Sequence, residues 1–196
     1  MSEELMLHLT TEKKERADAL RNRQILLETA SRLFEQDGVE NVTMSAVAEA
    51  AHVGKGTLYR HFTDKGALIL ALLDVDMHDL QARVFAHLRQ PFAPLDKLHW
   101  FLGEVAMFVI THNCLLMNSA EAHPEALRVH PAHSWWRQTI HGLLSQLPVC
   151  EQPDITADVL YLLLDVQTIR YQLEARHYSP ERIVDGLHYT LDKMAS

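Results

Sequence analysis

Residues 43–65, TMSAVAEAAHVGKGTLYRHFTDK, have the pattern of two short helices joined by a tight turn. Thr43 places a side-chain oxygen directly before a run of helix formers, which is where an N-cap residue is needed. A first helix is expected over about 44–51, the turn over 52–54 and a second helix over about 55–61. Two helices joined by so short a turn form a helix-turn-helix, which places its second helix in the major groove of DNA.

The second of these helices has an apolar side and a polar side. Leu58 and Phe62 lie four residues apart and face a common core with the small apolar residues of the first helix. The side chains left to point outward are Lys55, Thr57, Tyr59, Arg60 and His61. A narrow helix that carries hydrogen-bond donors suits base edges and phosphates. The alternative is an ordinary helical hairpin whose outer face is only solvated.

The segment GTLYRHFTDK, residues 56–65, resembles the TetR family of transcriptional repressors, and the resemblance extends over roughly residues 20–75. In that family the recognition helix, its tyrosine and a lysine at the start of the next helix contact DNA. The resemblance therefore implies that Thr57 reads bases or phosphates, and that Tyr59 and Lys65 bind phosphates. The whole set of residues expected to contact DNA is Thr43, Ser45, Lys55, Gly56, Thr57, Tyr59, Arg60, His61 and Lys65.

Lys65 is also unusual for its position in the chain. A cation at the start of a helix opposes the helix macrodipole, and a phosphate bound there would remove the conflict. Two residues depart from the family pattern. His52 stands where glycine is common, but histidine tolerates a positive φ. Gly54 stands where serine or a similar residue is common, so a hydroxyl contact at the start of the recognition helix is missing.

Composition indicates an ordinary globular protein of 196 residues, with 47% hydrophobic and 22% charged residues. No apolar run reaches the length of a membrane span, and the charged N-terminus does not read as a secretory signal, so a cytoplasmic protein without a membrane partner is expected. Cys114 and Cys150 do not have the spacing of metal ligands. The two cysteines fit a reducing compartment.

Charge is distributed unevenly along a chain whose formal net charge is -8. Residues 13–65 hold nine Lys and Arg against eight Asp and Glu, whereas residues 71–196 hold nine against fifteen. The sequence therefore predicts a small basic footprint on an acidic protein. DNA binding would depend on a few placed contacts and would weaken with salt.

The chain as a whole is expected to be all-α, with about nine helices in two parts. Residues 1–18 are interpreted as a flexible N-terminal arm, and residues 19–64 as a three-helix DNA-binding domain whose first helix ends at Gly38. Residues 65–196 would form a helical ligand-binding and dimerisation domain. Its first helix, over about 65–87, has no flexible linker before it and would carry movements to the recognition helix.

Proline and capping residues divide the remainder. Helices are expected over about 95–109, 120–129, 132–147 and 154–177. A last helix begins with Ser179 as N-cap and proline at the first helical position.

The last two predicted helices have more apolar side chains than packing against one neighbouring helix would bury. In the TetR family these helices form a four-helix bundle with those of a partner chain, and the alternative is burial within one subunit. The predicted homodimer interface is Leu160, Leu164, Tyr171, Ile183, Leu187 and Leu191. Two recognition helices about 34–36 Å apart would read a palindromic operator.

Large and polar side chains in the C-terminal part suggest a cavity for a small-molecule effector, although a plain hydrophobic core would need similar residues. His112 and Gln167 are the sharper candidates, because polar groups on apolar helices need partners. Asp165 is expected to pair with Arg170 or across the dimer. The predicted ligand-binding residues are Trp100, Met107, Phe108, His112, Met117, Trp135, Trp136, Tyr161 and Gln167.

Metal binding and catalysis are disfavoured. His123, His130 and His133 lie close in sequence to Glu121 and Glu125, but prolines interrupt any common helical face. No metal or other cofactor is therefore predicted. The chain has no GxSxG motif, phosphate-binding glycine loop or recognisable nucleophile with its base, so an enzyme is not expected.

The sequence favours a dimeric transcriptional regulator, in particular a repressor that a small molecule releases from its operator. One alternative is a DNA-binding protein of the same fold that needs no ligand. The other is a helical adaptor between proteins.

Overall fold

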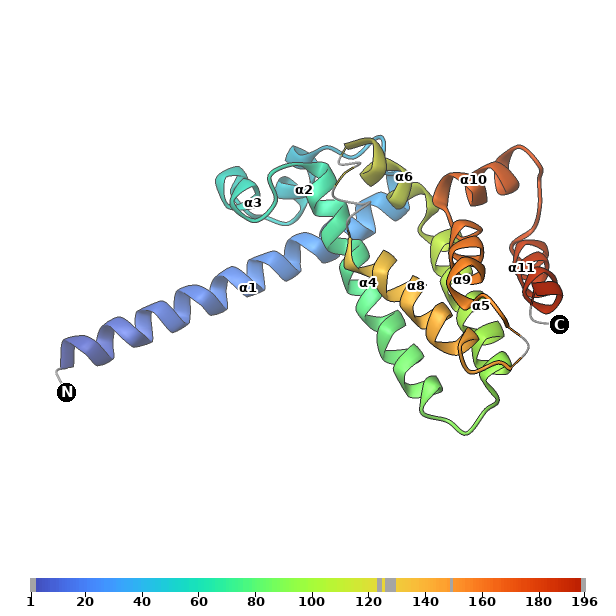
Figure 1. Cartoon of the computed structure of the whole chain (residues 1–196). Helices are drawn as coiled ribbons and strands as arrows, with labels where there is room; N and C mark the ends of the chain where they lie inside the picture. The colour runs from blue at the N-terminus through green and yellow to red at the C-terminus, as the bar shows by residue number, and fades with distance from the viewer. Residues whose placement is uncertain (1–2, 123–124, 126–129, 149, 195–196) are drawn as a thin grey trace. The chain divides into compact units, whose positions relative to one another are not determined.

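The computed structural model describes residues 3–122, 125, 130–148 and 150–194, with side chains from residue 16 onward. Within these residues every regular element is a helix (Figure 1), so the predicted all-α class is confirmed. The chain divides into two compact units, Met1–Leu72 and Leu73–Ser196, called unit 1 and unit 2 below. The division falls inside α4 (Lys65–Leu88) and not at its start, so this helix contributes residues to both units.

Unit 1 contains α1 (Glu3–Asp37), α2 (Met44–Ala50), α3 (Lys55–His61) and the first turns of α4. α1 begins at Glu3 and not near residue 19, so the helix includes residues that were expected to precede it. Its end agrees with the sequence, because Gly38 has a φ of 81° and donates its backbone N–H to the Phe34 carbonyl over 3.1 Å. Leu26 and Ala30 of α1 are fully buried in the core of this unit.

The helix-turn-helix forms as the local signals predict. The Thr43 hydroxyl oxygen accepts a hydrogen bond of 3.1 Å from the Ala46 N–H and caps α2. His52 has a φ of 53°, the left-handed conformation that turns the chain between α2 and α3. Gly54 is the N-cap of α3 and has no side chain to cap it, as expected. Leu58 and Phe62 are buried against α1 and α2.

Unit 2 is built around α5 (Pro94–Thr111), whose residues Leu98, Phe101, Leu102, Val105 and Ala106 are fully buried. The surrounding helices are α6 (Asn113–Ala122), α8 (Pro131–Leu144), α9 (Pro153–Leu162), α10 (Val166–Glu174) and α11 (Pro180–Met194). α5 packs against α8 and α11, and α8 packs against α9. α11 begins as predicted, with the Ser179 hydroxyl accepting a hydrogen bond of 3.3 Å from the Arg182 N–H.

The single helix predicted over 154–177 is wrong, because the chain forms two helices there. α9 ends at Leu162, and Asp165 caps the start of α10 by accepting a hydrogen bond of 2.9 Å from the Thr168 N–H through Oδ2. The side chain of Asp165 thus offers the backbone a local alternative to a continuous helix. The helix predicted over 120–129 lies partly at 123–124 and 126–129, outside the described residues, and α6 ends at Ala122.

Polar pairs join the helices of unit 2. Arg137 of α8 pairs with Asp158 of α9, and His99 of α5 lies 2.8 Å from Asp192 of α11. No single helix in the described part of the chain is long and apolar enough to cross a membrane. Only α5 and α6 together, bent by 69°, have that length and composition.

Candidate nucleic-acid interface and helical cavity

α3 has a polar outer face, and its inner side packs into the core of unit 1 through Leu58. Lys55 and Arg60 are exposed, and Tyr59 is 49% exposed despite its large apolar ring. Thr57 and His61 are half-buried and lie closer to the body of the domain. Of the predicted contacts on α2, Thr43 is exposed and Ser45 is half-buried. The arrangement combines cations for phosphates with short hydroxyl groups for base edges.

Two glycines at the start of α3 leave its backbone open. A Cβ atom placed on Gly54 or on Gly56 would meet no other atom within 4 Å. Packing within the domain therefore does not require glycine at either position. A glycine in the first turn of an exposed helix destabilises the helix relative to alanine but lets another backbone approach closely. The open backbone at Gly54 and Gly56 suits a helix whose first turn contacts the phosphate backbone of DNA.

Lys65 already has a partner within unit 1. Its ammonium donates a hydrogen bond to the backbone carbonyl of Val39 and lies 5.9 Å from the centre of the Phe34 ring. This contact explains a cation at the first position of α4 without a bound phosphate. Because an ammonium has three donors, phosphate binding remains compatible with this contact.

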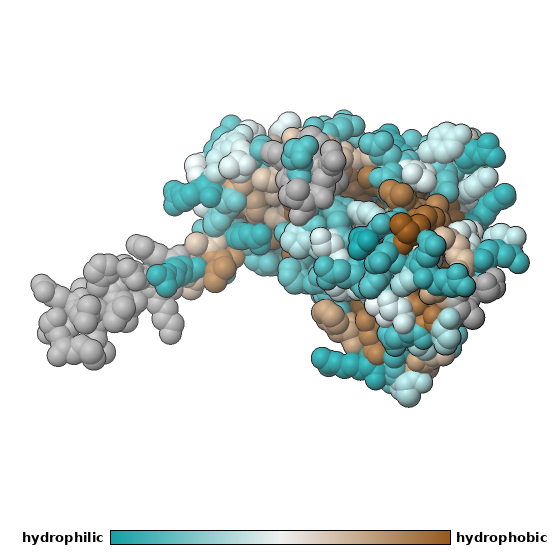
Figure 2. Space-filling model, in the orientation of Figure 1, coloured by the Kyte–Doolittle hydropathy of each residue, from teal (hydrophilic) through white to brown (hydrophobic). Residues whose placement is uncertain are grey.

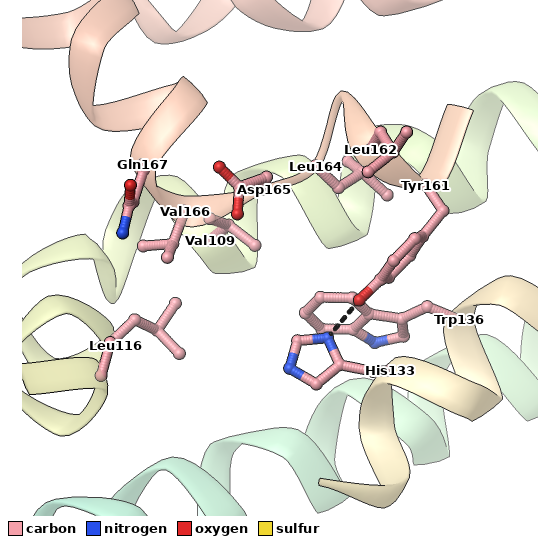
Figure 3. A pocket seen from close by; sticks show the side chains of 11 residues that line it. Val109, Leu116, His133, Trp136, Tyr161, Leu162, Leu164, Asp165, Val166 and Gln167 are labelled. Atoms are coloured by element: carbon pink, nitrogen blue, oxygen red, sulfur yellow. Dashed lines mark hydrogen bonds between the residues drawn. The ribbon is translucent and has the colours of Figure 1, made fainter. Parts of the chain in front are cut away.

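Unit 2 contains a cavity of about 570 Å³ (Figure 3). It is bounded by parts of α5, α6, α8, α9 and α10, together with the break between α9 and α10. The lining residues are Val109, Leu116, Ala120, His133, Trp136, Tyr161, Leu162, Leu164, Asp165, Val166 and Gln167. The broken helix thus supplies six of the eleven lining residues, so the break shapes the cavity.

The polar side of the cavity is centred on Tyr161 and His133. The Tyr161 hydroxyl lies 2.8 Å from His133 Nδ1 (Figure 3). The pKa of Tyr161 is raised by burial first and by the negative charge of Asp165 second, so the phenol stays neutral. Trp136 is 4% exposed, and its ring meets that of His133 edge to face at 5.6 Å between centroids.

Only part of the predicted ligand set lines this cavity. Trp136, Tyr161 and Gln167 do, whereas Met107, Phe108 and His112 line a separate, more open hollow of about 280 Å³ between α4 and α5. Met117 lies half-buried on α6, outside the residues that line either space.

Trp100 and Trp135 are accounted for by packing. Trp100 stacks on His87 with 3.9 Å between ring centroids. The Trp135 ring packs against the rings of Phe85 and Phe101, with 6.1 Å and 5.8 Å between ring centroids.

Two polar residues of the cavity lining, His133 and Asp165, are outside the predicted ligand set. The sequence favours a surface or packing role for His133 over metal binding, and it predicts that Asp165 pairs with Arg170 or across the dimer. In the structure Arg170 pairs with Glu174 at 3.0 Å instead. The one signal available in the sequence was that Asp165 interrupts an apolar helix, which is also what an N-cap residue does.

His112 lines the hollow between α4 and α5 and also contacts a side chain of α4. Its Nε2 lies 2.9 Å from Asp76 Oδ2, and its Nδ1 lies 2.8 Å from the Phe108 carbonyl oxygen. The imidazole therefore bridges an oxygen of α4 and an oxygen of α5. The next residue, Asn113, donates a hydrogen bond of 3.1 Å to the carbonyl of Val166, a cavity residue.

The predicted dimer-interface side chains mostly face the interior of their own subunit. Tyr171 is 59% exposed. The side chains at most 4% exposed are Leu160, Leu164, Ile183, Leu187 and Leu191. Packing of α11 against α5 and α9 accounts for their helical spacing without a partner.

A different apolar stripe is exposed on α9. Ile155 and Leu162 are 59% and 63% exposed, and Val159 between them is 37% exposed. Figure 2 shows hydrophobic surface among hydrophilic side chains over this part of unit 2. Three apolar residues at i, i+4 and i+7 form one face of a helix.

A metal site was not predicted, and the described residues contain no group of three His, Cys, Asp or Glu side chains placed to hold an ion. His123 lies outside those residues. His130 is 2.9 Å from Asp74 of α4, and His133 contacts Tyr161.

Comparison with known proteins gives one consistent result. The family described as "Bacterial regulatory proteins, tetR family" matches residues 26–72. The HTH-type transcriptional regulators SAB2452 and SAUSA300_2515 of Staphylococcus aureus, strains bovine RF122 / ET3-1 and USA300, are 30% and 31% identical over 170 residues. For both proteins these residues are 85% of this chain and 90% of the relative.

Solved structures share the fold at lower identity. A TetR/AcrR family regulator from Thermobifida fusca YX-ER1 has a TM-score of 0.67 and 18% identity, over 86% of this chain and 95% of its own. Thermus thermophilus FadR, a transcriptional repressor in complex with lauroyl-CoA, has a TM-score of 0.66 and 20% identity, over 89% and 95%.

Proposed function

Because the chain belongs to the TetR family of bacterial regulatory proteins, we propose that it is a cytoplasmic repressor that binds a palindromic operator as a homodimer and leaves it when a small molecule occupies the cavity of unit 2. DNA binding and transcriptional regulation are shared by the family. The homodimer, the palindrome, the direction of regulation and the effector are the proposed parts.

The polar face of α3 is the observation that carries the DNA-binding part. Thr57 is half-buried, so its short hydroxyl reaches a base edge only if the helix enters the groove deeply. The open backbone at Gly56 permits that approach. Tyr59 and Lys55 extend outward and are assigned to phosphates, which orient the helix without reading sequence.

The exposed stripe on α9 supports association of two chains. Ile155, Val159 and Leu162 would otherwise remain in water, and burying each such side chain contributes about 1.5–3 kcal/mol. A symmetric pair would use the same face twice, as in most homodimers. Two recognition helices then read two half-sites, which one helix with a small basic footprint would bind weakly.

Release by an effector follows from the connections of the cavity. Its wall includes Val166, whose carbonyl holds Asn113 at the corner between α5 and α6. His112 at that corner is bonded to Asp76 of α4, the helix that continues into unit 1. A ligand that fills the cavity favours one position of the α9–α10 break and, through these bonds, one position of α4. Effector binding then weakens operator binding, and operator binding weakens effector binding, by the same coupling free energy.

A selection of genomic fragments that the purified chain retains tests the proposal. We expect a recovered fragment to contain an inverted repeat and to be retarded in a gel by the dimer, with loss of retardation when either half-repeat is scrambled. Recovery of fragments without a repeat would contradict the palindromic operator. Failure to retain any DNA would favour the adaptor function.

Regulation without a ligand is the second candidate. It would be favoured if substitution of Ala120 by Leu, which fills the cavity from α6, changed neither operator affinity nor its response to metabolites. The size of the cavity favours an effector, since pockets of about 300–1,000 Å³ are typical of small-molecule sites.

A further inference from the structure

The charge distribution of the cavity narrows the chemistry of the effector. We infer that the ligand is an apolar molecule that carries a positive charge, such as an apolar amine or a quaternary ammonium compound. This inference rests on the proposed function only in assigning the cavity to the effector. Binding itself can be measured without DNA.

Most of the cavity wall is apolar. Five aliphatic side chains and one alanine form it, from α5, α6 and the broken α9–α10 helix: Val109, Leu116, Ala120, Leu162, Leu164 and Val166. An apolar ligand body is therefore required, because these groups offer no hydrogen bonds. The hydrophobic effect supplies most of the affinity for such a body.

Asp165 is the one charged residue among the described residues that line the cavity. Its Oδ2 accepts both bonds from Thr168, 2.9 Å from the N–H and 3.1 Å from the hydroxyl. This leaves Oδ1 to face a ligand. Asp165 is exposed at the edge of the cavity, so a positive group beside it would keep part of its hydration. Such a placement avoids the cost of burying a charge fully.

The aromatic side chains favour the same sign of charge. Tyr161 and Trp136 both line the cavity, and their ring faces attract cations. The described lining contains no Lys or Arg, so the carboxylate of an anionic ligand would find no permanently charged cation there and would meet Asp165 instead. The negative field at this wall is also felt by Tyr161, whose pKa Asp165 helps to raise.

A matched series of ten-carbon probes tests the inference on the full-length chain. Decyltrimethylammonium, decan-1-ol and decanoate share the alkyl chain and differ in charge, and each is titrated below its micelle concentration in a calorimeter. We expect the ammonium probe to bind most tightly and decanoate least. Equal or tighter binding of decanoate, or no binding of the ammonium probe, would overturn the inference.

Asp165→Asn identifies the residue responsible. Asparagine caps helices as well as aspartate does, so α10 should still form, and far-UV circular dichroism checks this. Affinity for decyltrimethylammonium should fall about two- to fivefold, the range expected for one partly exposed ion pair, while decanol affinity stays the same. Asp154→Asn is the matched control, since it makes the same change on α9 outside the cavity. An unchanged ammonium affinity in Asp165→Asn, or an equal loss in Asp154→Asn, would overturn the assignment.

DNA retardation with the same probes separates this inference from the proposed function. Operator binding without binding of the ammonium probe overturns the ligand class and leaves the DNA-binding function intact. Ammonium binding that does not release the operator supports the ligand class and contradicts the effector mechanism.

Discussion

Neighbouring residues on α3 differ in how far their side chains reach from the domain. Thr57 is half-buried and short, so its hydroxyl can serve only a group that comes close to the helix. Tyr59 is half-exposed and long, which lets its hydroxyl meet a phosphate at the edge of a groove. Substitution of Thr57 should therefore change sequence recognition, and substitution of Tyr59 should change affinity for DNA of any sequence.

Thr57→Ala should reduce operator affinity by about 1 kcal/mol, the value of one hydrogen bond, and leave affinity for random DNA unchanged. The smaller side chain removes a hydroxyl assigned to a base edge. Fluorescence anisotropy on both DNAs measures this, with Tyr59→Phe as the comparison, which should weaken both equally. Equal losses on both DNAs for Thr57→Ala would contradict its role in reading bases.

Lys65→Ala should destabilise the chain even without DNA. The substitution removes the hydrogen bond to the Val39 carbonyl and leaves that oxygen without this donor. We expect the free energy of unfolding to fall by about 1 kcal/mol in urea titrations. Lys55→Ala, at an exposed position, should leave stability unchanged. A Lys65→Ala chain of unaltered stability would return Lys65 to a role in phosphate binding alone.

At the scale of the helices, α8 and α9 are held together by charge as well as by apolar packing. Arg137 bonds to Asp158 between them, and this bond lowers the pKa of the Asp158 carboxyl and raises that of the Arg137 guanidinium. Both residues are partly exposed. The pair therefore makes the contact between these helices sensitive to acid.

Asp158→Asn should lower stability at neutral pH and have no effect in strong acid. The folded-state pKa of Asp158 lies below its unfolded value of about 3.9, so its contribution is complete above that pH. The contribution disappears as the pH falls through the folded-state pKa. Thermal unfolding at several pH values should show the wild-type and mutant curves converging in acid. Asp185→Asn, the same change at an exposed position of α11, is the control for the substitution itself. A constant difference at all pH values would contradict this account.

Asn113→Ala should weaken the coupling between effector and DNA. It removes the hydrogen bond that ties the corner between α5 and α6 to the cavity residue Val166. The ratio of operator affinities without and with effector should fall several-fold, since allosteric couplings are typically about 1–3 kcal/mol. Asn118→Ala is the control, because Asn118 bonds the Cys114 carbonyl within α6. An unchanged ratio in Asn113→Ala would exclude this route.

At the scale of the whole molecule, five of the six side chains predicted for the dimer interface are buried within their own subunit. Leu187 and Leu191 are buried in their own subunit, so charged substitutions there would unfold the chain and say little about a dimer. The exposed stripe on α9 is the better surface, because it can be changed without disturbing the core.

The double substitution Ile155→Glu and Val159→Glu should give a folded monomer with greatly reduced operator affinity. Introducing four carboxylates into a symmetric interface opposes association, and a monomer contacts only one half-site. Light scattering gives the mass and circular dichroism the helix content. Val75→Glu, at an exposed valine of α4, should remain dimeric. A double mutant that is still a dimer would place the interface elsewhere.

What the sequence determined by itself are the features that depend on neighbours within a few residues. Thr43 caps α2, Gly38 ends α1 and Ser179 starts α11, because each bond joins atoms three or four residues apart. The helix-turn-helix follows from such signals together with its resemblance to a known family. Asp165 is an exception, because the sequence predicts one long helix in which it pairs with Arg170 or across the dimer, whereas it caps the start of α10.

Only the tertiary structure decided which similar side chains have which neighbours. Trp136 lines the cavity while the adjacent Trp135 packs against Phe85 and Phe101. The stripe of α11 faces its own subunit, and Lys65 finds the Val39 carbonyl twenty-six residues away. An apolar stripe has the same spacing whether it meets its own core or a partner. The choice is made by contacts between residues far apart in the chain, and helical periodicity carries no information about those contacts.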